Sequence, residues 1–202
     1  SPQPIVLKKN IVYAGALLAG LLLPFGFLYL MFLLDTKVHT RDDIEKVTTN
    51  IPILAEIPEI KKKGSLLFTN PNATSVLAES FRILSANVDY VIPKNDEIGG
   101  KVIFSTSTIK GEGKTFVSLN LSLALASLNK KVLLIGADMR NPQIHTYFGT
   151  SKNQLGLSSY LNDASVNWKE LLMSGFDKHP KHYTMLSGAI PPNPAHLLTN
   201  GR

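Results

Sequence analysis

Hydrophobic residues are concentrated in one uninterrupted run near the start of the chain. From Ile11 to Leu34 there is no charged residue. At a rise of about 1.5 Å per residue, a helix of this length crosses a hydrocarbon core of about 30 Å. Pro24 would break such a helix in water but is tolerated as a kink in a membrane. A signal peptide would have a shorter apolar core and a small-residue cleavage site, which residues 35–37 do not provide. We therefore predict a transmembrane helix over 11–34.

Beyond this run, apolar positions are divided among short segments, as in a protein of alternating strands and helices. We expect a polar connector over 61–72. The other predicted elements are a juxtamembrane helix over 40–50 with Thr40 as its N-cap, an edge strand between prolines over 51–58, a helix over 74–91, a buried strand over 101–105, a helix over 115–128 and a second buried strand over 132–135. Two apolar strands joined by a helix favour a parallel, doubly wound α/β sheet.

The chain is basic, with a formal net charge of +6. Lys8 and Lys9 flank the apolar run, and Lys61–Lys63 form a short cluster. Aromatic residues are not interleaved with these charges and no nucleic-acid motif is present, so we predict no nucleic-acid partner. We expect the basic residues to face anionic lipid headgroups instead. The absence of cysteine excludes a disulfide framework and a thiolate metal site.

Two further sets of residues have structural interpretations. The histidines lack the spacing of a metal site, and we expect them on the surface or in loops. They are His39, His145, His179, His182 and His196. We expect the protein core to include Tyr160, Leu161, Trp168, Leu171 and Leu172.

The most specific motif lies between the predicted strand over 101–105 and the predicted helix over 115–128. Residues 105–115 read STSTIKGEGKT. A glycine-rich loop between a strand and a helix is the context of a phosphate-binding P-loop. Gly111 and Gly113 would let backbone N–H groups turn toward phosphate oxygens at the positive end of the helix dipole. Lys114 would reach the β- and γ-phosphates, and the Thr115 hydroxyl would ligate Mg²⁺.

A second candidate feature follows the strand over 132–135. Ligands of such sheets bind in the crevice beyond the carboxyl ends of the strands, where Asp138 would lie. Asp138 could hold Mg²⁺ or its water and accept the proton of an attacking hydroxyl. Arg140 could contact phosphate or pair with Asp138. We therefore assign catalytic roles to Lys114, Asp138 and Arg140, and metal coordination to Thr115 and Asp138.

With both motifs identified, the chain resembles the bacterial tyrosine kinases (BY-kinases) joined to polysaccharide chain-length regulators. The loop over 105–115 resembles their Walker A motif, and residues 134–140 resemble their second motif, Walker A′. Residues 79–87 resemble a helix that mediates ring assembly in the family, and residues 187–194 resemble a stretch before Walker B. The apolar run resembles the last span of the regulator. The resemblance covers nearly the whole chain.

The resemblance implies a P-loop α/β domain, with a parallel sheet incomplete at the C-terminus, preceded by one transmembrane helix. It implies ATP and Mg²⁺ as cofactors and transfer of the γ-phosphate to tyrosine, in an autokinase that regulates capsular or exopolysaccharide polymerisation and export. Implied partners are further copies of the chain through Glu79 and Arg82, the export machinery and membrane lipid. The implied location is the bacterial inner membrane, with the P-loop in the cytoplasm. The implied nucleotide contacts are Ser107, Lys110, Gly111, Glu112, Gly113, Lys114, Thr115 and Phe116.

We expect four segments along the chain. Residues 1–10 would end an extracytoplasmic segment, 11–34 would span the membrane, 35–73 would form a juxtamembrane linker, and 74–202 would be the N-terminal part of the kinase domain. We also expect the protein to continue beyond both ends, because no Walker B strand or tyrosine-rich tail is present in residues 1–202.

Three departures from the family pattern leave other functions open. Thr108 stands where the usual P-loop begins with glycine, Gly136 replaces the first Walker A′ aspartate, and Ser85 replaces the last arginine of the assembly motif. One alternative is therefore a non-catalytic chain-length scaffold with a decayed nucleotide domain. Another is a partitioning-type P-loop ATPase, although the signature lysine of that class would stand at Ile109.

Overall fold

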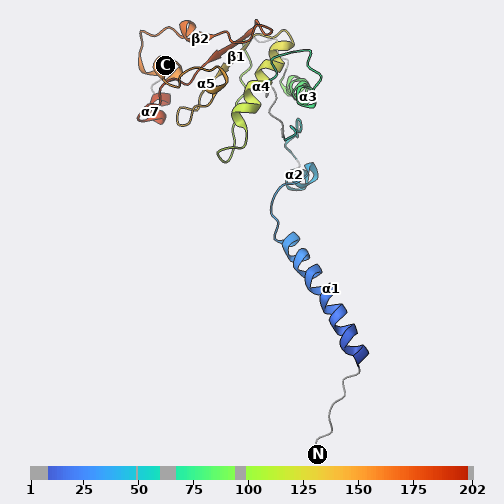
Figure 1. The fold of residues 1–202 in the computed structure, drawn as a ribbon. Helices are drawn as coiled ribbons and strands as arrows, with labels where there is room; N and C mark the ends of the chain where they lie inside the picture. Colours follow the sequence, from blue (N-terminus) through green and yellow to red (C-terminus); the bar gives the residue numbers. More distant parts are fainter. Residues whose placement is uncertain (1–8, 49, 60–66, 94–98, 200–202) are drawn as a thin grey trace, which may run out of the picture. The chain divides into compact units, whose positions relative to one another are not determined.

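The computed structural model in Figure 1 describes residues 9–48, 50–59, 67–93 and 99–199. The chain divides into two compact units, Ser1–Ile53 and Leu54–Arg202. The basic cluster Lys61–Lys63 and residues 1–8, where an extracytoplasmic segment is expected, lie outside the described residues.

The first unit contains the apolar run as a single helix. α1 spans Lys9–Leu33 with Pro24 inside it, and within the described part of the chain it alone is long and apolar enough to cross a membrane. α2 spans Arg41–Val47, with Thr40 as its N-cap. The Asp43 carboxylate accepts the Thr40 N–H at 2.9 Å, which caps the first turn. Helices therefore form at both predicted places; α1 begins two residues earlier than predicted, and α2 is shorter than the predicted 40–50.

The second unit contains the remaining helices and the sheet. In chain order its elements are α3 (Val76–Val91), α4 (Lys114–Ser127), β1 (Val132–Ile135), α5 (Ile144–Tyr147), α6 (Leu157–Asn162), the 3₁₀-helix η1 (Trp168–Leu171), β2 (Leu172–Met173), β3 (His182–Met185) and α7 (Pro194–Thr199). The predicted helices over 74–91 and 115–128 and the predicted strand over 132–135 are therefore confirmed within a few residues.

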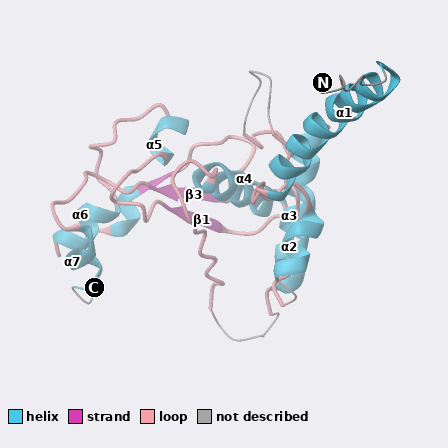
Figure 2. Ribbon diagram, turned by 90° about the horizontal axis from the view of Figure 1, so that it is seen from below, coloured by secondary structure: helices cyan, strands magenta, loops and turns pink. Residues whose placement is uncertain are grey.

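The three strands form a mixed sheet in the order β1-β3-β2. β1 and β3 are parallel, with Val132 opposite His182, whereas β2 is antiparallel to β3, with Leu172 opposite Met185. The predicted parallel arrangement therefore holds for β1 and β3, and β2 adds an antiparallel edge strand. β2 and β3 are joined without an intervening helix, and a chain that turns back on itself pairs antiparallel, because a parallel pair needs a crossover. Figure 2 shows α4 lying against β1 and β3.

Two predicted strands are not strands in the structure. The segment 101–105 has irregular backbone, and its Val102 and Phe104 side chains are 75% and 90% exposed. A cavity of about 330 Å³ lies between this segment, α4 and β1, with Ile103 and Leu133 among its lining residues. The cavity therefore separates this segment from β1, and the two form no backbone hydrogen-bond ladder. The segment 51–58 is also irregular; its prolines cannot donate to a ladder.

The core of the second unit lies around α3 and α4, which pack side by side (Figure 1). Phe81 of α3 and Leu119 and Leu123 of α4 are completely buried. Phe68, from the segment expected to be a polar connector, is buried with them. Trp168, in contrast, is 41% exposed. Its prediction as a core residue is wrong, because it begins the short η1 turn and its ring lies beside the Lys169 ammonium.

Candidate functional site

The glycine-rich loop leads directly into α4. Gly111 and Gly113 have φ angles of 97° and 90°, in the left-handed region that favours glycine, and Gly113 is the N-cap of α4. A Cβ added to either glycine would meet no atom within 4 Å, so the requirement for glycine here is one of backbone conformation. The two turns expose the loop's backbone at the positive end of the α4 dipole.

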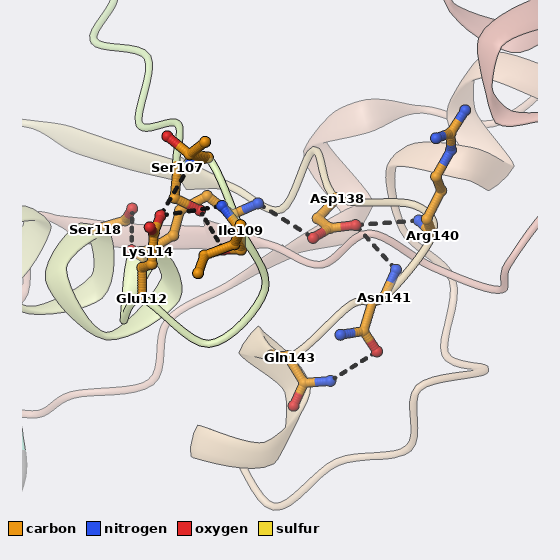
Figure 3. A network of polar contacts seen from close by, with 10 residues as sticks. Ser107, Ile109, Glu112, Lys114, Ser118, Asp138, Arg140, Asn141 and Gln143 are labelled. Carbon is orange, nitrogen blue, oxygen red and sulfur yellow. Dashed lines mark hydrogen bonds and ion pairs between the residues drawn. The ribbon is translucent and has the colours of Figure 1, made fainter. Parts of the chain in front are cut away.

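The loop amides already bind an anionic group. The Glu112 carboxylate accepts the Thr108 N–H at 2.9 Å and the Ile109 N–H at 3.2 Å through the same oxygen, Oε2 (Figure 3). Two adjacent amides that converge on one carboxylate oxygen form a small anion-binding nest. The loop therefore has the donor arrangement that a phosphate requires, and in this state an internal carboxylate satisfies it.

The loop lysine and the aspartate after β1 are brought together. Lys114 Nζ lies 3.3 Å from Asp138 Oδ2. The other oxygen, Oδ1, accepts the backbone N–H groups of Asn141 at 2.9 Å and Arg140 at 3.2 Å. These bonds lower the pKa of the Asp138 carboxyl below its usual value. The hydrogen bond from the Asn141 N–H lowers the pKa most, and the Lys114 ammonium lowers it further. Partial burial acts in the opposite direction and raises the pKa, but it does not outweigh these bonds. Asp138 is therefore an anion at neutral pH, held in place on one side and paired with Lys114 on the other.

The other predicted nucleotide contacts are distributed unevenly around this pair. The Ser107 hydroxyl donates to Ile109 O at 3.3 Å, and Lys110 is exposed. Thr115 is half-buried in the first turn of α4. The Phe116 ring packs edge-on against Phe81, 5.7 Å between centroids, so its side chain belongs to the core. The exposed Arg140 side chain points away from Asp138, and it is the backbone of Arg140 that contacts this carboxylate (Figure 3).

The residues expected to contact another copy of the chain are bonded within the chain. Arg82 Nη1 donates to Glu79 Oε2 at 2.8 Å. Its Nη2 donates to Pro71 O at 2.8 Å and also to Ala73 O. The guanidinium lies over the Phe68 ring, 5.5 Å from the centroid. Arg82 thus holds the segment before α3 against the core.

A buried polar cluster lies beside this segment, and sequence reasoning missed it. Asn120 on α4 is completely buried, and its Oδ1 accepts the Phe68 N–H at 2.6 Å. His179 Nε2 donates to Phe68 O at 2.9 Å, and His182 Nε2 lies 2.8 Å from the Ser122 hydroxyl. An asparagine among the apolar residues of a core helix was a usable signal, because such a side chain needs hydrogen-bond partners.

The expectation that all five histidines lie on the surface or in loops is wrong for His182, which begins β3 and is 1% exposed. His179 lies in the loop before β3, as expected, but it is only 2% exposed. Burial disfavours the charged imidazolium, so it lowers the pKa of both. The pKa of His182 falls to about 4, with the neighbouring His179 adding to the effect. The hydrogen bond to Phe68 O partly opposes the lowering for His179. Both rings are therefore neutral at neutral pH, and their Nδ1 atoms have no hydrogen-bond partner among the described residues.

Gly136 lies in a crowded position at the end of β1. It is buried, and its N–H donates to Met185 O at 2.9 Å. A Cβ added here would lie 2.7 Å from Ser187 Oγ, 3.0 Å from Ser187 N and 3.3 Å from Ile144 Cδ1. The loop after β3 therefore occupies the space that a side chain at position 136 would need.

Comparisons with known proteins bear on what this site does. No family model matches the chain. It is 28% identical to a putative tyrosine-protein kinase in the cps region of Klebsiella pneumoniae, over 99% of this chain and 29% of that protein. It is 35% identical to the tyrosine-protein kinase YwqD of Bacillus subtilis, over 69% of this chain and 58% of that protein. The kinase domain of the Escherichia coli tyrosine kinase ETK matches with a TM-score of 0.66 and 25% identity, over 81% of this chain and 65% of that domain.

The chain is a homologue of the bacterial tyrosine kinases. The structural similarity to the ETK kinase domain confirms the P-loop α/β fold class. The sequence similarity covers 99% of the chain, so it includes α3, α4 and the sheet. The chain spans less than two thirds of the length of either relative named here.

Proposed function

We propose that this BY-kinase homologue is the membrane-anchoring and nucleotide-binding part of an ATP-dependent tyrosine autokinase that regulates capsular or exopolysaccharide polymerisation and export. The observation that carries the proposal is the loop of residues 107–115 with its opposing aspartate. Its amides converge on an anion, and its Lys114 lies 3.3 Å from Asp138 at the end of β1. Kinases need this combination of an anion cradle, a mobile cation and a fixed carboxylate to bind and transfer phosphate.

The residues present fit ATP and Mg²⁺. The contacts of Glu112 show that the loop amides donate to an anionic oxygen, and the position next to Gly111 and Gly113 is open. Thr115 and Asp138 would supply hard oxygen ligands, and Mg²⁺ needs only one or two protein ligands when phosphates and water complete its shell. When bound, Mg·ATP supplies the transferable phosphoryl group and neutralises its charge.

The chain's own residues have distinct roles in this proposal. Lys114 leaves Asp138 and binds phosphate. Its Nζ lies 3.3 Å from Asp138 Oδ2 and both side chains are partly exposed, so their ion pair is weak and is given up at little cost. Asp138 remains held by the Asn141 N–H and accepts the proton of the attacking tyrosine hydroxyl. Arg140, with its exposed guanidinium, contacts phosphate.

The proposed surroundings follow from α1 and from the homology. α1 lies in the bacterial inner membrane in contact with lipid, residues 1–10 lie outside the cytoplasm, and the segments 35–73 and 74–202 are a cytoplasmic linker and kinase region. The proposed partners are further copies of the protein, whose tyrosines receive the phosphate, and the polysaccharide export machinery. The support is the apolar length of α1 and the cps-region relative of Klebsiella pneumoniae.

The proposed topology can be tested with single cysteines, because the chain has none of its own. Ser1→Cys should react with an impermeant thiol reagent in intact cells, whereas Arg202→Cys should react only after lysis. Reaction of position 202 but not of position 1 in intact cells would show the opposite orientation.

A second candidate function, a non-catalytic chain-length scaffold, is favoured by one observation. Position 136 carries no carboxylate and has no room for one beside Ser187. The deciding experiment is a tyrosine autophosphorylation assay of the full-length protein with Mg·ATP. We expect phosphotyrosine to accumulate in the parent protein and not in Lys114→Met. A parent protein that binds ATP without forming phosphotyrosine would support the scaffold instead.

A further inference from the structure

The segment before α3 is anchored at one residue by three distant parts of the chain. Phe68 is 3% exposed. Its N–H donates to Asn120 Oδ1 at 2.6 Å, and its carbonyl accepts from His179 Nε2 at 2.9 Å. Its ring lies under the Arg82 guanidinium and 6.1 Å from the His179 ring. A backbone held at both its N–H and its C=O, with a buried ring between them, has a single docked position.

This anchor is connected to the first turn of α4 by two routes. Along the first, Asn120 Nδ2 donates to Phe116 O at 2.9 Å, so one side-chain amide joins the Phe68 backbone to a carbonyl two residues after Lys114. Along the second route, the Phe116 ring packs against the Phe81 ring of α3. Phe81 is followed directly by Arg82, whose guanidinium lies over the Phe68 ring. Together with the peptide bond between Phe81 and Arg82, these contacts form a closed circuit of five residues: Phe68, Asn120, Phe116, Phe81 and Arg82.

We propose that Asn120 is a positioning residue that couples the docking of Phe68 to the conformation of the nucleotide loop. The proposal rests on the proposed function, because the ligand at the loop is taken to be Mg·ATP. Lys114 is the first residue of α4, and Asn120 lies about 9 Å further along the same helix. Close-packed interiors transmit small shifts because they have few voids that could absorb them.

The physical basis is the change that the loop must make when phosphate binds. In the structure Glu112 occupies the loop amides and Asp138 holds Lys114. Phosphate must replace both carboxylates, which rearranges the residues at the start of α4. The Phe116 carbonyl and ring move with that turn, and Asn120 and Phe81 carry the movement to Phe68. Coupling between two sites is reciprocal, so a nucleotide that tightens the anchor must itself bind more tightly when the anchor is docked.

The first test measures the Phe68 amide itself in the full chain, in detergent micelles. Hydrogen exchange is followed at residue resolution without ligand, with saturating Mg·ATP, and in Lys114→Met with Mg·ATP. We expect Mg·ATP to protect the loop amides and to slow exchange of the Phe68 N–H by at least about fivefold, the lower end of usual coupling. Lys114→Met should show neither effect.

The outcomes separate the inference from the function on which it rests. Protection of the loop amides without any change at Phe68 overturns the coupling and leaves nucleotide binding established. No protection at either place, with no measurable ATP binding, overturns both. A merely structural anchor would keep Phe68 equally protected with and without nucleotide.

The second test reverses the direction and uses a matched pair of variants. Phe68→Leu keeps apolar bulk but removes the ring from Arg82 and His179. Phe148→Leu makes the same change at a half-buried ring that packs on Phe176 in the same core, outside the circuit of five residues. We expect the folded Phe68→Leu protein to bind a fluorescent ATP analogue about fivefold more weakly, and Phe148→Leu to bind it like the parent. Equal affinities of the two variants would overturn the coupling.

Discussion

The nucleotide loop and the Phe68 anchor differ in how far their contacts reach along the chain. In the loop, Glu112 satisfies amides three and four residues away, and Asp138 lies 24 residues from Lys114. In the anchor, Phe68 is bonded to Asn120 and His179, which are 52 and 111 residues away. The loop is also largely exposed, whereas the anchor is buried.

This difference predicts how each region tolerates change. Exposed charges that are paired with one another can exchange their partners for a ligand at little cost, because solvent screens them in both states. Buried polar groups cannot lose a partner without leaving an unsatisfied donor or acceptor. Substitutions in the loop should therefore alter binding and chemistry with the fold intact, and substitutions around the anchor should first alter stability.

The largest expected effect is on nucleotide binding. Lys114→Met removes the cation that faces phosphate, and we expect ATP affinity to fall on the order of 100-fold, the upper range for a lost charged hydrogen bond. The thermal unfolding midpoint should change little, because the Lys114–Asp138 ion pair is partly exposed. Isothermal titration with ATP measures the affinity. Lys152→Met, in an exposed loop, is the matched control. Unchanged affinity in Lys114→Met would contradict the site assignment.

Next is the effect of Asp138→Asn on phosphoryl transfer. The asparagine oxygen can still accept the Asn141 N–H, so the local turn and ATP binding should persist. Loss of the general base should lower autophosphorylation of the full-length protein by about 10²–10⁴-fold. The assay follows phosphotyrosine with Mg·ATP at fixed protein concentration. Full activity in this variant would remove Asp138 from the catalytic machinery.

The anchor should make stability depend on pH. The folded-state pKa of His182 is about 4, against 6.5 for the free side chain, so the unfolded chain binds more protons between these values. The free energy of unfolding should therefore be at its full value above about pH 6.5. It should fall as the pH drops toward 4, by about 3 kcal/mol for this histidine. His179 changes in the same direction. Urea unfolding at several pH values measures the slope.

Two variants sharpen this test. His182→Gln retains an amide donor for Ser122 but does not titrate, so it should flatten the slope. His196→Gln, at an exposed position in α7, should leave the slope unchanged. If both variants kept the parent slope, His182 would not be the cause.

The smallest expected effect concerns the crowded end of β1. Gly136→Ala places a methyl group 2.7 Å from Ser187 Oγ and should cost about 1–3 kcal/mol of unfolding free energy. Adding Ser187→Gly should recover part of the loss. Gly99→Ala meets no atom within 4 Å and is the control. Gly136→Asp needs still more space, so we expect it to destabilise the protein rather than supply a second working carboxylate. Equal stability of Gly136→Ala and the parent would contradict the packing around Ser187.

The elements that sequence reasoning predicted correctly are those specified by short-range patterns. α1 follows from an uncharged run, the start of α2 from the Thr40 cap, and α3, α4 and β1 from apolar periodicity. The motifs also placed Lys114 and Asp138 in one site, but they did not predict that the two pair; Arg140 was the residue expected to contact phosphate or pair with Asp138.

The errors concern contacts that no local pattern reports. Phe68 stands in a polar stretch, and its burial depends on Arg82, Asn120 and His179. The strand expected over 101–105 has the right composition but faces a cavity instead of a neighbouring strand. Arg82 donates to two carbonyls of its own chain, a structural role that the resemblance did not indicate, and its predicted contact with another copy of the chain stays a prediction.

The unpaired edge of β1 affects how this polypeptide would behave when purified. In the described part of the chain β1 is bonded to β3 on one side, and its other side faces the cavity beside the exposed Val102 and Phe104. A free strand edge next to apolar side chains is a template for self-association. In detergent micelles that cover α1, residues 1–202 produced alone should therefore scatter light increasingly with concentration. Phe104→Lys should suppress this aggregation, because a charge beside an open edge opposes the docking of a further strand.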